Sequence, residues 1–471
     1  MVKSKQLLTE GPIFVRFFLF TVPIIASGLL QVFYNMADNI VVGSFSNDPL
    51  ALGAVGSTGT LTTLIVRLLL GFATGSGVVI AHCYGERAIS KLSKSIHTAI
   101  TFAFISGILL ALLGFCFSDR ALTLIGTKPE LHSRALLYFR IICIGIPAST
   151  VYNFGSAILR AVGDSKTPLY ILMTTGLANV LMNLLFVIVF GMTVDGVALA
   201  TIISQYMSAA TVMLALIRRK EEGTSFSFKK MEINPGLLKR IIIYGLPAGL
   251  QSTIFSLANI LITSSVNTLP TTSVTANTIA GNIDGLVHTA QESFSHSAVT
   301  FAGQNLGAKK FDRIKKISLY SIIQVTAVGI LLGQLILLFG DPIASLYINP
   351  AEENKELILE AVREVMGVIL NTYFLCGIMN VLTGLCRGLG NSFAPMIIGI
   401  AGVCGVRIIW ILFVFPLEAF NSLTGLYISM PLTWVFCVVA LLITFIITWK
   451  KRVREAKIKE ETEATAHSAT E

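Results

Sequence analysis

Charged residues are scarce in this chain, and so are the motifs of common enzyme classes. Only 13% of its 471 residues are Asp, Glu, Lys or Arg. No HExxH, GxSxG or GxxxxGK[ST] pattern occurs, so zinc proteases, serine hydrolases and P-loop ATPases lack their chemistry here. The seven cysteines form no CxxC pair and lie in or beside apolar stretches, where we expect them to pack as small hydrophobic residues. The sequence therefore predicts no catalytic residue and no cofactor.

Long apolar runs fill most of the chain. Hydrophobic residues make up 54% of it, and the mean hydropathy is +0.76. The first run is too long for the core of a signal peptide and carries Asp38. We expect an all-α polytopic membrane protein with about twelve spanning segments of roughly twenty or more residues. These lie near residues 13–42, 50–80, 95–118, 135–158, 168–190, 196–217, 241–266, 273–303, 317–340, 361–386, 393–416 and 422–448.

Lysine and arginine gather after the even-numbered segments. The basic stretches are 87–94, 160–166, 218–240, 309–316 and 450–454. The positive-inside rule therefore predicts that both termini are cytoplasmic, as in a multi-pass protein of a bacterial inner membrane. The net charge of +9 then reflects topology, and we expect no nucleic-acid partner. The polar tail, residues 452–471, is expected to be disordered.

The two halves of the chain resemble each other. LRAVGDSKTP at 159–168 returns as CRGLGNSFAP at 386–395, a shift of 227 positions, and Pro23 and Pro247 differ by 224. A near-constant shift predicts two six-helix lobes around a central cavity. We place the N-terminal lobe at 1–217, a cytoplasmic linker at 218–238 and the C-terminal lobe at 239–451.

Asp38 is the most informative residue of the first segment. An aspartate at the bilayer centre costs roughly 2.5–3.5 kcal/mol, so it indicates a functional site. Its polar neighbours recur every three or four residues and share one helix face: Ser27, Gln31, Tyr34 and Asn35. These neighbours either line a substrate cavity or only satisfy the carboxylate. Arg67, in the second segment, is a possible structural partner for Asp38 or Glu292.

The eighth segment carries a similar polar face. Its residues at three-to-four spacing are Asn277, Gly281, Asp284, His288, Gln291, Glu292 and Ser295. Two acids and a histidine in one spanning segment are expected to line a cavity, where they bind a cationic substrate or carry a proton. Pairing of these acids with Arg407 is the structural alternative. Gln251, on the seventh segment, extends the same predicted surface.

Several of these stretches together resemble the multidrug and toxic compound extrusion (MATE) transporters. They are YNMADNIVVG in the first segment, GSGVVIAHCYG in the second, LRAVGDSKTP after the fourth and FAGQNLGAKK after the eighth. AGNIDGLVH, GVRIIW and GLYISMPLTW are most similar to branches common in Gram-positive bacteria. The resemblance implies a two-lobe secondary antiporter that exports organic cations and other amphiphiles in exchange for Na⁺ or H⁺.

The resemblance also implies a cation site in the N-terminal lobe. The family's positions match Asp38, Asn179 and Thr201, but Asn183 stands where many members carry a second aspartate. Asn179 and Asn183 share a helix face, and their amide oxygens beside one carboxylate and one hydroxyl suit a hard cation such as Na⁺. With a single carboxylate, sodium and proton coupling both stay open. Without the family, these asparagines could equally join helices.

The expected substrates are small cationic or amphiphilic molecules, moved by alternating access. Aromatic faces such as Tyr34 and Tyr152 can each hold an organic cation with about 0.5–2 kcal/mol, and Asn153 lies beside Tyr152. We expect the protein to act as a monomer. A flippase for lipid-linked intermediates, from the same superfamily, is the alternative, although the acidic eighth segment argues against it.

Overall fold

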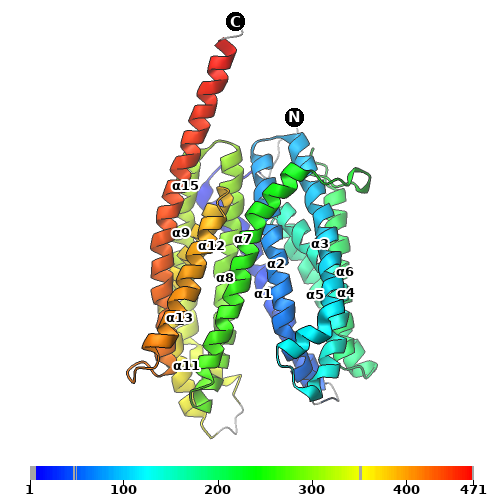
Figure 1. Cartoon of the computed structure of the whole chain (residues 1–471), viewed down its shortest axis with the longest axis vertical. Coiled ribbons are helices and arrows are strands. Elements are labelled where there is room, and N and C mark those ends of the chain that lie inside the picture. The colour runs from blue at the N-terminus through cyan, green and yellow to red at the C-terminus, as the bar shows by residue number, and fades with distance from the viewer. Residues whose placement is uncertain (1–6, 46–47, 49, 349–352, 469–471) are drawn as a thin grey trace. The chain divides into compact units, whose positions relative to one another are not determined.

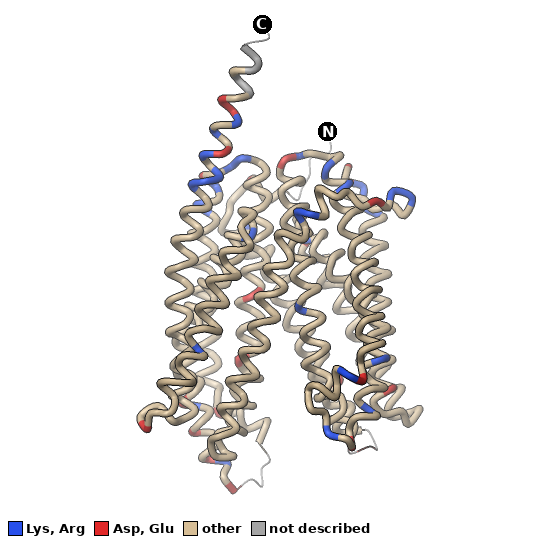
Figure 2. The backbone as a smooth tube through the Cα atoms, viewed as in Figure 1, with Lys and Arg blue, Asp and Glu red and all other residues tan. Residues whose placement is uncertain are grey.

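The computed structural model describes residues 7–45, 48, 50–348 and 353–468. Within these residues the secondary structure is helical, with no strand. In the part of the chain that the structure describes, eleven helices are long and apolar enough to cross a membrane. Figure 2 shows that charged residues are sparse along the middle of the helices and more frequent toward their ends. The protein is therefore a multi-pass, all-α membrane protein, as the sequence predicts.

The chain divides into two compact units, residues 1–7 with 19–250 and residues 8–18 with 251–471. In the first unit, α4 packs against α2, α3 and α6, and α5 packs against α6. The helices that contribute to it are α1 (Ile13–Phe45), α2 (Ala51–Gly85), α3 (Ile89–Leu124), α4 (Pro129–Ala161), α5 (Lys166–Leu184), the π-helical η1 (Leu185–Val189), α6 (Val194–Ile217), η2 (Phe228–Lys230) and the first half of α7 (Pro235–Val266) (Figure 1).

In the second unit, α11 packs against α8, α9 and α15. Its helices are α8 (Thr271–Gly307), α9 (Phe311–Leu338), α10 (Gly340–Ser345), α11 (Lys355–Gly388), α12 (Phe393–Gly399), η3 (Ile400–Val406), α13 (Arg407–Ile409), η4 (Trp410–Val414), α14 (Leu423–Tyr427) and α15 (Ser429–Ser468). The eighth predicted segment is the 37-residue helix α8. Its polar face explains why it is not one of the eleven described helices that are apolar enough to count as membrane spans.

The internal repeat is visible in the backbone. Arg87 and Lys309, 222 positions apart, both end a long helix with φ of 55°. Gly163 and Gly390, 227 positions apart, also have positive φ, at 92° and 76°. Non-glycine residues seldom adopt this conformation, so its return at the same spacing marks equivalent turns in the two halves.

The boundary between the units lies inside α7, whereas the sequence placed it in the linker at 218–238. Two glycine pairs spaced by four residues, Gly71 with Gly75 on α2 and Gly245 with Gly249 on α7, bring these helices into backbone contact. A Cβ atom on Gly245 would lie 2.7 Å from the Cα of Phe72. Small residues at this spacing allow membrane helices to approach closely, so the first half of α7 belongs with α2.

The C-terminal tail differs from the expected disorder. α15 continues through it as one helix to Ser468 (Figure 1, red), and residues 469–471 lie outside the described chain. Glu, Ala and Lys favour helix, and Glu455 lies 2.8 Å from Arg452 and 4.0 Å from Lys451 on the preceding turn. Local helix propensity therefore extends the last spanning helix beyond its apolar part.

Candidate functional site

Asp38 lies on α1 beside polar residues of α5 and α6. The amide Nδ2 of Asn183 donates a hydrogen bond to the Asp38 carboxylate, and the Thr201 side chain lies close enough to interact with it. The same Asn183 nitrogen lies 3.5 Å from the Oδ1 of Asn179. Asn179 and Asn183 are only 5% and 0% exposed. The structure thus brings together the four residues that the resemblance implied.

An apolar cluster fixes the position of these polar groups. It contains Val41 and Val42 from the turn of α1 after Asp38, and Val197 from the turn of α6 before Thr201. Between membrane-spanning helices such side chains hold the contact by van der Waals packing. Immediately after the asparagines, α5 widens into the π-helical turn η1. Such turns are frequent at functional sites.

The oxygen atoms at Asp38 fit a hard cation. The Oδ1 of Asn183 is buried and has no hydrogen-bond partner within the described part of the chain. The Thr201 hydroxyl donates to the backbone oxygen of Val197 at 2.9 Å, which leaves its own lone pairs available. A carboxylate, two amide oxygens and a hydroxyl supply the ligand type that Na⁺ and hydrated protons require. The unpartnered oxygen is the atom that a bound cation would satisfy.

One further side chain adjoins this site. Tyr138 of α4 lies close enough to Asp38 for their side chains to interact electrostatically, and it packs against the same apolar cluster. The sequence missed Tyr138, because nothing in α4 relates its register to α1. Arg67, for which the sequence offers Asp38 as a structural partner, forms no ion pair with Asp38 among the described residues, and its Nε is buried without a hydrogen bond.

The remaining polar face of α1 is mostly exposed. Gln31 and Asn35 are exposed, whereas Tyr34 is half-buried. The ring of Tyr34 packs on Gly176 of α5, and its hydroxyl lies 3.5 Å from the backbone oxygen of Met173. Tyr34 therefore also contributes to the packing of α1 on α5.

Tyr152 and Asn153 on α4 make local contacts away from the Asp38 cluster. The Tyr152 hydroxyl lies 3.5 Å from the backbone oxygen of Pro168. Asn153 donates to the backbone oxygen of Ser149 at 2.9 Å. Both side chains are half-buried, so their predicted contact with substrate stays a prediction.

The polar face of α8 lies in the second unit. His288 and Glu292, one turn apart, are 4.0 Å apart and nearly half exposed. Asp284 is half-buried, and the Tyr373 hydroxyl lies 3.5 Å from its backbone oxygen. The three titratable groups thus follow one face of α8, as their spacing predicts.

The alternative role of the α8 acids was pairing with Arg407. Arg407 is 7% exposed, and its Nη1 lies 3.4 Å from the Oδ1 of Asn259. Among the described residues no ion pair within 4.0 Å joins Arg407 to Asp284, although their charges still interact. Direct pairing is therefore not how this structure accommodates Asp284.

Two glutamines that were predicted to line a cavity are buried inside the second unit. Gln251 is 6% exposed and accepts a hydrogen bond of 2.7 Å from Arg387. Gln291 is 0% exposed, and both its amide atoms lack a hydrogen-bond partner. Gly329 and Gly377 pack directly on the Gln291 amide. Because these glycines have no side chains, α9 and α11 can pack against Gln291 and bury it. Helical periodicity alone had predicted that Gln291 lines a cavity.

Comparison with known proteins agrees with this architecture. The MatE family model matches residues 23–185 and 247–413, one segment in each half of the chain. "Probable multidrug resistance protein YoeA" of Bacillus subtilis is 27% identical over 92% of this chain and 94% of its own. An "FAD transporter" of Shewanella oneidensis is 23% identical over 85% and 87%. A structure described as the outward-facing conformation of a multidrug resistance MATE family transporter superimposes with a TM-score of 0.86 at 20% identity, covering 97% of this chain and 99% of that one.

Proposed function

Since this chain belongs to the MATE family of transporters, we propose that it is a secondary antiporter that exports organic cations or other amphiphiles in exchange for Na⁺ or H⁺. The observation that carries the proposal is the cluster of Asp38, Asn179, Asn183 and Thr201 within the first unit. A carboxylate in a spanning helix needs a compensating role, and binding of the coupling cation supplies one.

The Asp38–Asn183 hydrogen bond provides the means of coupling. A cation that binds the Asp38 carboxylate competes with the Asn183 amide for the same oxygen. Cation binding therefore exchanges a contact between α1 and α5 for contacts with the ion. A ligand that interacts differently with two arrangements of these helices shifts the population between them, which is the requirement of alternating access.

The substrate side of the proposal rests on α8. Asp284 and Glu292 place two acidic side chains on one face of α8, and His288 lies between them, 4.0 Å from Glu292. These groups suit a cationic amphiphile. The Shewanella relative is named as a transporter of FAD, which is an anionic molecule. We therefore include amphiphiles other than cations among the proposed substrates.

The proposed location is a bacterial inner membrane with both termini in the cytoplasm. Arg160 lies in the last turn of α4, and Arg218 directly follows α6. The segments after these two helices are joined by an ion pair of 3.2 Å between Arg219 and Asp164, so both helix ends lie at one end of the first unit. Basic residues at this end support the cytoplasmic assignment. We further propose that the protein acts as a monomer on small-molecule substrates. A lipid-linked-intermediate flippase is not favoured by any relative described above.

The test is export of a fluorescent organic cation from proteoliposomes, driven first by an imposed sodium gradient and then by an imposed pH gradient. We expect one gradient to drive transport in the wild type and Asp38→Asn to abolish it. Thr211→Val is the matched control, because the Thr211 hydroxyl bonds only within its own helix on an exposed face. A wild type that responds to neither gradient, or an unaffected Asp38→Asn, would refute the proposal.

A further inference from the structure

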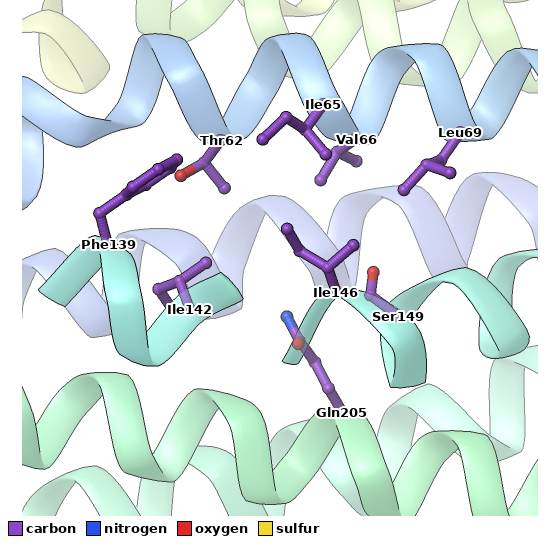
Figure 3. A pocket seen from close by; sticks show the side chains of 9 residues that line it. All are labelled: Thr62, Ile65, Val66, Leu69, Phe139, Ile142, Ile146, Ser149 and Gln205. Atoms are coloured by element: carbon purple, nitrogen blue, oxygen red, sulfur yellow. The ribbon is translucent and has the colours of Figure 1, made fainter. Parts of the chain in front are cut away.

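A narrow pocket lies between α2, α4 and α6 of the first unit (Figure 3). The space in it that is open to the centre of a water molecule is about 20 Å³. This is enough for about one water molecule. Most of its wall is apolar, and the polar side chains among its lining residues are Thr62, Ser149 and Gln205.

Two polar atoms of these lining residues have no hydrogen-bond partner among the residues that the structure describes. The Oε1 of Gln205 and the Oγ1 of Thr62 are both buried without a hydrogen bond. Thr58, one turn earlier on α2, bonds a carbonyl of its own helix, as membrane threonines commonly do. Gly145 leaves room for the Gln205 amide, because a Cβ atom there would overlap Oε1. The wall of this water-sized space thus includes a glutamine and a threonine whose side-chain oxygen atoms have no hydrogen-bond partner among the described residues.

The pocket lies one helical turn from the Asp38 cluster on two separate helices. Gln205 follows Thr201 by four residues on α6, and Ile142 follows Tyr138 by four residues on α4. Ile142 lines the pocket and also packs in a cluster with Ala198, against which Tyr138 lies. Both helices run from the Asp38 cluster through the pocket toward their basic ends. The pocket is therefore displaced from the cation site toward the end assigned to the cytoplasm.

We propose that this pocket is a hydrated transit site for the coupling cation on its way from Asp38 to the cytoplasmic side. Gln205, Thr62 and Ser149 supply oxygen atoms for a partly hydrated Na⁺ or for water that carries a proton. Three uncharged groups bind a cation weakly, which suits a site of passage. Ile142, between the two sites, separates them. The inference rests on the proposed antiport.

The test uses near-isosteric variants that remove one oxygen each, Gln205→Met and Thr62→Val. For each variant we measure cation binding at equilibrium, through the thermal stabilisation by Na⁺ or by a change of pH, and gradient-driven export from proteoliposomes. We expect binding within about twofold of wild type and turnover lowered about fivefold, the equivalent of one lost hydrogen-bonding group. Thr62→Ser, which keeps the hydroxyl, should retain wild-type turnover.

Thr211→Val again serves as the matched control. Wild-type turnover in both Gln205→Met and Thr62→Val would overturn the inference. A parallel loss of binding and transport would also overturn it, because the pocket would then form part of the Asp38 site. If Gln205→Met does not fold, Thr62→Val and its Thr62→Ser partner decide the question. A wild type that neither gradient drives would instead refute the antiport itself.

Discussion

The substitution Asn183→Leu should weaken cation binding while changing the stability of the fold little. Leucine has nearly the shape of asparagine but cannot donate to Asp38 or offer a cation an oxygen. Loss of the hydrogen bond to the carboxylate costs about 1.5–3 kcal/mol of unfolding free energy. Removal of the unpartnered, fully buried Oδ1 returns about 1–3 kcal/mol. The two effects oppose each other, so we expect the unfolding free energy without cation to change by no more than about 2 kcal/mol.

Cation binding should respond much more strongly. Loss of one ligand or its orienting partner typically weakens metal affinity about 10- to 100-fold. At a cation concentration of 100 times the wild-type Kd, binding stabilises the native state by about 2.7 kcal/mol, and a tenfold weaker Kd reduces this to about 1.4 kcal/mol. The assay is thermal unfolding of the detergent-solubilised protein against sodium concentration and against pH, with gradient-driven export alongside.

Asn153→Leu is the matched control, because Asn153 donates to backbone of its own helix and contacts none of the Asp38 cluster. It should retain the full cation-dependent stabilisation. An Asn183→Leu variant with wild-type cation dependence would show that Asn183 is not a ligand. A loss of several kcal/mol in the absence of cation would show that its Oδ1 is satisfied in the membrane.

Three further substitutions test other parts of the structure. Arg134 forms an ion pair with Asp48, which lies between α1 and α2; burial alone would raise the pKa of Asp48, but its hydrogen bonds and the charge of Arg134 lower it. The ion pair therefore stabilises the fold above the unfolded-state pKa of about 3.9, and this stabilisation is lost as the pH falls through the lower folded-state pKa. In Asp48→Asn the melting temperature should consequently depend less on pH between pH 7 and 3. Gly71→Ala should lower unfolding free energy by about 1–3 kcal/mol through overlap with α7 backbone, whereas Gly59→Ala, with open space, should be neutral or stabilising in the same melts. Gln291→Met should raise the melting temperature, because it removes two unpaired buried atoms, and a drop would mean that they are hydrated.

The sequence could predict the helices and the repeat because both depend on local patterns. Apolar length determines the spanning segments, and positive φ at Gly163 and Gly390 follows from the repeated turn motif. The boundary between the two units could not be predicted from a local pattern. It depends on which glycines of α2 contact glycines of α7, and the sequence contains 39 glycines without indicating which of them are in contact.

The cation cluster and the pocket show the same difference. Asp38 could be predicted from the free-energy cost of placing a carboxylate inside a membrane, whereas Asn179, Asn183 and Thr201 were predicted only from the family resemblance. Gln205 could have been noticed as an amide one turn after Thr201 in an apolar helix. Whether its Oε1 has a hydrogen-bond partner, however, depends on how α2, α4 and α6 pack together, which the sequence does not show. The burial of Gln291 likewise depends on glycines of two other helices.

The single carboxylate of the cation cluster has a consequence for energetics. With Asn183 in place of a second acid, the site neutralises one positive charge, so each cycle should return one Na⁺ or one H⁺. Exchange for a monovalent organic cation then moves no net charge, and its rate should not change when a potassium diffusion potential is imposed on the proteoliposomes. A neutral substrate would instead gain about 2.3 kcal/mol per 100 mV, roughly a 50-fold gradient. A strong effect of the potential on export of a monovalent cation would require a second coupled charge, and Asp284 and Glu292 would then be the groups to substitute.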